Sequence, residues 1–191
     1  IAFSLRTGGD DDGFFRNKLT GYTKDEFEKL QKKYPGDFEH FIELIPGYGH
    51  QIDYTKTTPW LSKYVRKPHP KHVMWEDFEM DGIYRKGFYN LYVEEDPRGN
   101  FNYRIAYTMD IEDNDITLAV QKTVYSTKES QDGIDLKFSK YYSKINRGKV
   151  RIYLNDKLVD LSKPVKVTAN GKVLFNGMVK ANLRDMVNSC A

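Results

Sequence analysis

The sequence predicts an α/β segment followed by an all-β domain. In residues 1–68, two apolar runs, Ile1–Leu5 and Phe41–Ile45, flank a stretch with the periodicity of a helix. From residue 69 onward, apolar and polar residues instead alternate with a period of two, as in half-buried strands. Pro68 and Pro70 lie where the pattern changes. We therefore expect two domains, residues 1–68 and residues 69–191.

The first domain is expected to contain a buried strand, a helix and a second buried strand. Thr23 and Glu26 have the spacing of a capping box, which predicts a helix start at Thr23. Pro35-Gly36 ends this helix, and Pro46-Gly47 ends the second strand. Thr58-Pro59 predicts a further short helix with Thr58 as its N-cap.

The second domain is expected to be β-sandwich-like, because short apolar segments and turn signals follow one another closely. Aromatic residues make up 14% of the chain and concentrate after residue 70, which favours strands. Asn170-Gly171 predicts a type I′ turn between two strands. The expected strands are His72–Met80, Ile83–Val93, Tyr103–Met109, Ile116–Val124, Ile134–Phe138, the hairpin of Val150–Leu154 with Lys157–Val159, and the hairpin of Val165–Thr168 with Lys172–Phe175.

Composition and charge exclude several classes of protein. The net charge is +3 and the two signs are interspersed, so no nucleic-acid surface is expected. No apolar stretch approaches the roughly 20 residues of a membrane span. The single cysteine, Cys190, excludes an internal disulfide framework. The chain opens on Ile1 rather than methionine, so we expect it to be part of a longer protein, which leaves a periplasmic or secreted location open.

One polar residue after each of the first two expected strands is a candidate for catalysis. Asp11 lies in the acidic turn after the first strand, and His50 follows Gly47-Tyr48-Gly49 after the second. An imidazole can take a proton from a hydroxyl near neutral pH, and a carboxylate can hold its other ring proton. We therefore predict that His50 is a general base oriented by Asp11. Asp10 and Asp12 are alternative acids, and a solvated turn is the non-catalytic alternative.

Several segments resemble a known group of enzymes. They are Thr7–Lys18, Gly47–His50, Pro59–Leu61, Val73–Trp75, Val159–Val167 and Asn170–Lys172. The first two resemble the end of an α/β-hydrolase catalytic domain, and the whole set is similar to Bacteroidetes-type esterase- or peptidase-like hydrolases with an appended C-terminal β-rich domain. The resemblance implies the last two strands and helices of an α/β-hydrolase sheet, the chain order nucleophile, acid, histidine, and no cofactor or metal ion.

The nucleophile that this resemblance requires has no counterpart in the sequence, because no Gly-x-Ser-x-Gly motif is present. We therefore expect the C-terminal portion of a serine hydrolase that acts on a small ester or peptide-like substrate, inactive by itself. Alternatively, the β domain is a carbohydrate- or protein-binding module, or a purely structural one. An apolar strand at residues 1–6 would leave an open sheet edge, which predicts a homo-oligomer.

Three other groups of residues are weaker candidates for a binding site. His69 and His72, on either side of Pro70, and an acidic turn could bind a metal ion, but exposed loops explain both patterns more simply. A set of tyrosines could form a platform for sugars, although cross-strand packing is the default explanation. The acidic turn is Asp110, Glu112, Asp113 and Asp115, and the tyrosines are Tyr84, Tyr89, Tyr92, Tyr103 and Tyr107.

Overall fold

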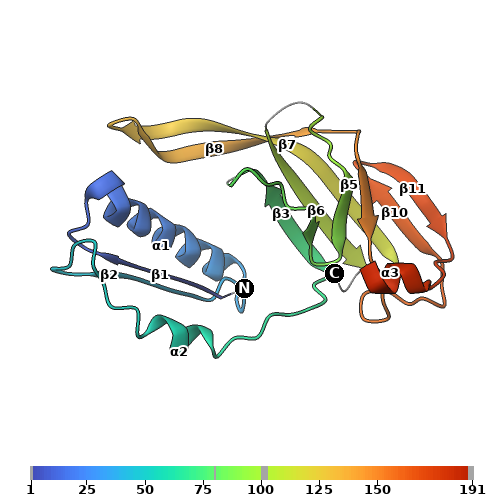
Figure 1. The fold of residues 1–191 in the computed structure, drawn as a ribbon, viewed down its shortest axis with the longest axis horizontal. Coiled ribbons are helices and arrows are strands. Elements are labelled where there is room, and N and C mark those ends of the chain that lie inside the picture. Colours follow the sequence, from blue (N-terminus) through green and yellow to red (C-terminus); the bar gives the residue numbers. More distant parts are fainter. Residues whose placement is uncertain (1, 80, 100–102, 189–191) are drawn as a thin grey trace. The chain divides into compact units, whose positions relative to one another are not determined.

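The computed structural model describes residues 2–79, 81–99 and 103–188, which form two compact units (Figure 1). Unit 1 comprises the chain up to Arg66 together with Glu129–Leu136. Unit 2 comprises Lys67–Lys128 and the chain from Lys137 onward. The chain thus divides between Arg66 and Lys67, beside the two prolines noted in the sequence.

The predicted fold class, an α/β segment with part of an α/β-hydrolase sheet followed by a β-sandwich-like domain, is wrong. The chain is mostly β, with 42% of residues in strands and 17% in helices, and its sheets are mixed. Two causes can be identified. The described chain up to Arg66 contributes only a two-stranded sheet, and the largest sheet contains a parallel pair of strands, β10 (Val165–Ala169) with β7 (Asp115–Gln131), beside antiparallel pairs.

Unit 1 is built from two parallel strands and a long helix that packs against both of them. β1 (Phe3–Gly8) pairs with β2 (His40–Ile45), and α1 (Arg16–Lys33) connects them (Figure 1). A short 3-10 turn, Gly13–Phe15, precedes α1, and α2 (Thr57–Leu61) follows β2. Because the two strands are parallel, the loops that follow them lie at the same end of the sheet.

The helices begin earlier than the capping patterns predicted. α1 begins at Arg16, and Thr23 lies inside it, where its hydroxyl donates a hydrogen bond to the Leu19 carbonyl at 2.9 Å. A threonine hydroxyl can bond to the preceding helical turn as readily as it can cap, so the Thr23 pattern was misleading. α2 begins at Thr57 and not after Thr58.

Unit 2 contains a larger and a smaller sheet. The larger one has the strand order β11-β10-β7-β6-β3, with β8 paired to β7, and the smaller one has the order β4-β5-β9. A short helix, α3 (Leu183–Asn188), follows the last strand. The strands are β3 (His72–Asp77), β4 (Gly87–Phe88), β5 (Leu91–Glu95), β6 (Arg104–Glu112), β7 (Asp115–Gln131), β8 (Ile134–Lys144), β9 (Lys149–Ile152), β10 (Val165–Ala169) and β11 (Lys172–Gly177).

The turn chemistry of unit 2 was predicted in one case and missed in another. Asn170 and Gly171 adopt φ values of 50° and 88°, and the expected hairpin between β10 and β11 is confirmed. The hairpin expected at Asn155-Asp156 does not form. Instead the Asn155 carbonyl accepts hydrogen bonds from the backbone N–H groups of Leu158 and Val159, and this turn leads into a loop.

The hydrophobic core of the described chain lies mainly in unit 2. Ile105, Tyr107 and Met109 on β6 are fully buried, and Leu118 on β7 is 1% exposed. The Trp75 ring stacks on Tyr107 with 5.1 Å between centroids. Tyr107 is therefore a core residue, as cross-strand packing predicts, and is not accessible to a sugar.

Candidate functional site

Backbone hydrogen bonds join the loop after β1 to the loop after β2. The Gly9 N–H donates to the Ile45 carbonyl at 2.8 Å, and the Asp10 N–H donates to the Tyr48 carbonyl at 3.0 Å. The acidic turn and the histidine turn are thus held together by main-chain contacts before any side chain is considered. This arrangement follows from the parallel pairing of the two strands, which ends at Gly8 and Ile45.

Gly8 allows the two loops to approach this closely. A Cβ atom at Gly8 would lie 2.0 Å from the Gly49 carbonyl oxygen and 2.1 Å from that of Tyr48. Both of these atoms belong to the backbone, so a side chain at this position would force the histidine loop away from the strand.

Asp11 and His50, the predicted catalytic pair, contact each other in this region. His50 Nδ1 lies 3.0 Å from Asp11 Oδ2. A carboxylate only accepts hydrogen bonds, so the contact assigns the proton of the neutral imidazole to Nδ1 and leaves Nε2 as the free acceptor. The Asp11 side chain is 8% exposed and that of His50 is 75% exposed. The carboxylate is therefore buried, whereas most of the surface of the imidazole ring is exposed.

Burial distinguishes Asp11 from the two acids beside it. Asp10 and Asp12 are both exposed, whereas Asp11 is buried. The Asp11 N–H donates to the Gly8 carbonyl at 3.2 Å, which turns the chain so that this side chain points inward. The sequence leaves Asp10, Asp11 and Asp12 as possible partners of His50, and in the structure Asp11 is the one that contacts it.

Two residues at the start of α1 complete the surroundings of Asp11. Arg16 Nη1 lies 3.0 Å from Asp11 Oδ1, so each carboxylate oxygen has a separate partner. The Asn17 N–H donates to the Asp11 carbonyl, and Asn17 Nδ2 donates to the Gly9 carbonyl, both at 3.0 Å. From the sequence, Arg16 and Asn17 could either line the mouth of the site or simply begin the helix, and the helix start is favoured. The structure shows that Arg16 begins the helix and also contacts Asp11.

These contacts lower the pKa of Asp11. The hydrogen bond from His50 is the largest cause, the burial of the carboxylate opposes it, and the hydrogen bond and charge of Arg16 lower the pKa further. Asp11 is therefore ionised at every pH at which a histidine could act as a base.

The turn between Asp11 and α1 has an unusual backbone. Phe14 and Phe15 adopt φ values of 53° and 54°, a left-handed conformation that bulky residues rarely take. Phe14 is 70% exposed, so core packing does not account for its conformation. Strained backbone of this kind concentrates at functional sites, and here it lies directly after the buried acid.

Among the residues that the structure describes, no hydroxyl or thiol makes a hydrogen bond with the His50 ring. Within the described residues, Asp11 is the one hydrogen-bond partner of the His50 ring. The described side chains therefore provide an acid–base pair, and Nε2 remains available for a hydroxyl supplied by another group. Cys190, the single cysteine of the sequence, lies outside the described residues.

The predicted metal candidates are engaged in other contacts. His72 Nδ1 lies 2.5 Å from Asp110 Oδ1, and His69 Nδ1 lies 3.4 Å from Asn155 Nδ2. Across the described ranges, no group of three or more histidine, cysteine or acidic side chains is arranged to hold a metal ion.

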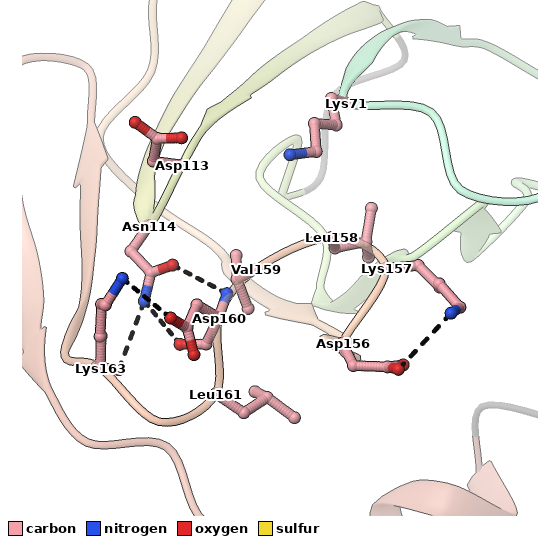
Figure 2. Close-up of a pocket in the computed structure, with 10 residues that line it drawn as sticks. All are labelled: Lys71, Asp113, Asn114, Asp156, Lys157, Leu158, Val159, Asp160, Leu161 and Lys163. Atoms are coloured by element: carbon pink, nitrogen blue, oxygen red, sulfur yellow. Dashed lines mark hydrogen bonds and ion pairs between the residues drawn. The ribbon is translucent and has the colours of Figure 1, made fainter.

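Unit 2 contains a separate open pocket of about 610 Å³, shown in Figure 2. Asn114 holds one side of it, because its side chain donates to the carbonyls of Asp160, Lys163 and Pro164 and accepts from the Asp160 N–H. Lys163 lies 3.0 Å from Asp160, so these charges neutralise each other. The pocket is lined by Lys71, Asp113, Asn114, Asp156, Lys157, Leu158, Val159, Asp160, Leu161 and Lys163.

Comparison with known proteins gives no relative for this chain: no family model, no curated protein and no solved structure matches it. In the described part of the chain, no helix is both long and apolar enough to cross a membrane.

Proposed function

We propose that this chain carries the acid and the base of a serine hydrolase that cleaves an ester or peptide-like acyl bond. The observation that carries the proposal is the contact of His50 Nδ1 with the buried Asp11 at 3.0 Å, with the rest of the ring exposed. Catalysis of this kind needs an oriented imidazole whose second nitrogen faces the reacting groups. The resemblance of Thr7–Lys18 and Gly47–His50 to hydrolase sequences supports the same assignment.

In the proposed reaction, a serine hydroxyl attacks the acyl carbon of the substrate while His50 Nε2 accepts its proton. The Asp11 carboxylate stabilises the imidazolium that forms. His50 then returns the proton to the alcohol or amine that leaves. Water releases the acyl group by the same route, losing its proton to Nε2, and the serine is restored. The reaction requires no cofactor.

The serine is proposed to come from polypeptide outside these 191 residues. Support for this comes from the sequence, which has no Gly-x-Ser-x-Gly motif, and from the open Nε2 of His50. We infer that this chain belongs to the C-terminal portion of a Bacteroidetes-type hydrolase. Its own 191 residues are then expected not to hydrolyse p-nitrophenyl acetate, and turnover that a fluorophosphonate abolishes would contradict the assignment.

Substitution of His50 in the intact protein tests the proposal directly. His50→Ala is expected to reduce ester hydrolysis by roughly 10⁶-fold, because the serine then has no base. His69→Ala is the matched control, since it removes an exposed histidine from unit 2 and is expected to leave the rate unchanged. Equal activity of the two variants, with both of them folded, would overturn the proposal.

We also propose that the 191 residues by themselves associate with a second copy through β1 of unit 1. Among the described strands, β2 is the one partner of β1, so the other edge of β1 is open. Open edges recruit strands from other chains because their N–H and C=O groups lack partners. A two-stranded sheet is also marginal alone, which favours such an addition.

A further inference from the structure

Arg16 occupies a position that the stability of its own helix does not explain. It is the first residue of α1, an 18-residue helix with no acidic residue in its first turn. The start of a helix carries partial positive charge, so a cation there is unfavourable to the helix. Residues that break a local rule in this way are often held by a functional site.

The contacts of Arg16 point toward the catalytic pair. Its Nη1 atom lies 3.0 Å from Asp11 Oδ1, while His50 Nδ1 lies 3.0 Å from Oδ2 of the same carboxylate. A carboxylate with one partner can turn about its Cβ–Cγ bond and exchange its two oxygens. With a different partner on each oxygen, that rotation would break both contacts, so Asp11 is held in one orientation.

Two residues of the turn before α1, Gly13 and Phe14, also lie against the guanidinium of Arg16. A Cβ atom at Gly13 would lie 2.8 Å from Arg16 Nη1, so glycine leaves the space that the guanidinium needs. The Phe14 ring lies under the guanidinium, with 5.1 Å from the Arg16 Cζ atom to the ring centroid. The left-handed backbone of Phe14 thus has a consequence, which is to place this ring against Arg16.

We propose that Arg16 is a positioning residue, which holds the Asp11 carboxylate so that Oδ2 alone faces His50 Nδ1. This inference rests on the proposed function of the Asp11–His50 pair, and it adds a fourth side chain to the site. Through Asp11, Arg16 selects the tautomer of His50 in which Nε2 is free to accept a proton. Its charge also keeps the carboxylate ionised, in agreement with the lowered pKa of Asp11.

The proposal is tested on the 191-residue chain by NMR, with no substrate and no activity assay. Arg16→Gln removes the charge and the second anchor. The ¹³Cγ titration of Asp11 is then expected to move to higher pH, and the ¹⁵N shifts of His50 are expected to show a smaller share of the Nδ1–H tautomer. Lys24→Gln is the matched control, because it removes one charge from the same helix and contacts Glu28 instead of Asp11. We expect no change in either signal for that variant.

Arg16→Lys distinguishes the effect of the charge from that of the guanidinium geometry. A lysine keeps a positive charge near Asp11 but lacks the planar fork of the guanidinium. The ¹³Cγ titration of Asp11 is therefore expected to stay close to that of the native chain, while the share of the Nδ1–H tautomer of His50 falls. If Arg16→Gln does not fold, Arg16→Lys alone tests the positioning role of Arg16. An unchanged tautomer share in the folded Arg16 variants would overturn the positioning role. The hydrolysis assay of His50→Ala tests the proposed hydrolase function separately. The positioning role of Arg16 can therefore be disproved without disproving the hydrolase function, and the reverse also holds.

Discussion

At the scale of single residues, the Asp11 carboxylate makes the site sensitive to acid. Its pKa is lowered in the folded chain, with the hydrogen bond from His50 as the largest cause. The stability that Asp11 contributes is therefore fully present above pH 3.8, which is the pKa of the carboxyl in the unfolded chain. It is lost as the pH falls through the lower pKa of the folded chain. We expect an NMR titration of Asp11 to have its midpoint below 3.8. His50→Ala should move that midpoint upward and His69→Ala should not, whereas a native midpoint above 3.8 would contradict the described contacts.

A second residue-scale prediction concerns Arg98, whose guanidinium is almost completely buried in unit 2. It is 1% exposed and donates to Asp96, to the Tyr103 carbonyl at 2.7 Å and to both the carbonyl and the side chain of Asp77. Arg98→Met would leave the charge of Asp77, which is 3% exposed, without a counter-ion. We expect a loss of about 3–5 kcal/mol in the free energy of unfolding, measured by urea denaturation.

The control for Arg98→Met is an exposed ion pair of the same type. Arg85 lies 2.6 Å from Asp81, and the two side chains are 60% and 50% exposed. Arg85→Met should reduce the free energy of unfolding by less than about 1 kcal/mol, because an exposed pair is screened by water. Similar losses in the two variants would show that Arg98 is not buried as described.

At the scale of elements, the joined ends of β1 and β2 depend on the absence of a side chain at Gly8. In Gly8→Ala, the new Cβ would overlap the Tyr48 and Gly49 carbonyl oxygens. We expect a loss of about 1–3 kcal/mol in the free energy of unfolding, together with weaker contact between Asp11 and His50. Thermal denaturation and the His50 ¹⁵N spectrum measure these two effects.

Gly21→Ala is the matched control, because Gly21 lies in α1 with no neighbouring atom within 4 Å of an added Cβ. Alanine there should raise the free energy of unfolding by about 0.5–1 kcal/mol, since glycine is a poor helix former. If Gly8→Ala were as stable as Gly21→Ala, the close approach of the two loops would be disproved.

The loop that borders the pocket in unit 2 gives another element-scale prediction. The Asn114 side chain makes hydrogen bonds to main-chain groups of Asp160 and Lys163 (Figure 2) and to the Pro164 carbonyl. Asn114→Ala removes all of these partners. Because these hydrogen bonds are exposed, we expect the free energy of unfolding to fall by about 0.5–1.5 kcal/mol in urea denaturation. Asp156→Ala should change it by less than about 0.5 kcal/mol, because this side chain is 77% exposed and its ion pair with Lys157 is exposed to solvent. Equal effects would contradict the bridging role.

Strands and tight turns of this fold can be predicted from the sequence, whereas the pairing of distant strands cannot. Period-two alternation located most strands of unit 2. The Asn170-Gly171 turn was predicted because a type I′ turn depends only on positive φ values at its two central residues. By contrast, Asn170 also donates to the Ile145 carbonyl at 2.7 Å, a contact 25 residues away that no local pattern encodes. The parallel pairing of β10 with β7 is equally non-local. The fold class was wrong for this reason, since the sequence indicates strands but not their partners.

The candidate site illustrates the same division. Asp11 and His50 could be predicted because each follows a strand and carries a side chain suited to proton transfer. The contact of Arg16 with Asp11 could not, since the turn between them contains Phe14 and Phe15 in a left-handed conformation that no phenylalanine in a sequence indicates. The positive φ of these residues became evident only from the backbone itself.

At the scale of the whole molecule, the described part of unit 1 up to Arg66 has little hydrophobic core. Ile42, at 7% exposure, is the only buried apolar side chain there, whereas Phe14, Tyr54 and Val65 are at least 64% exposed. Parallel sheets are normally covered on both faces and contain more strands. Unit 1 is therefore expected to depend on additional polypeptide, and the open edge of β1 is the place where a strand can be added.

That dependence leads to a prediction of self-association through β1. Backbone N–H groups alternate in direction along a strand, and those of Phe3 and Gly9 bind the Glu39 and Ile45 carbonyls on the β2 side. The N–H of Ser4 therefore points to the open edge. We expect sedimentation velocity of the native chain to show a concentration-dependent dimer, and Ser4→Pro to weaken it, because proline has no N–H to donate. Ser4→Ala is the matched control, since it loses the hydroxyl contact to the Phe41 carbonyl but keeps the N–H. A native chain that stays monomeric at high concentration, or an alanine variant that dissociates as readily as the proline variant, would show that copies do not pair along this edge.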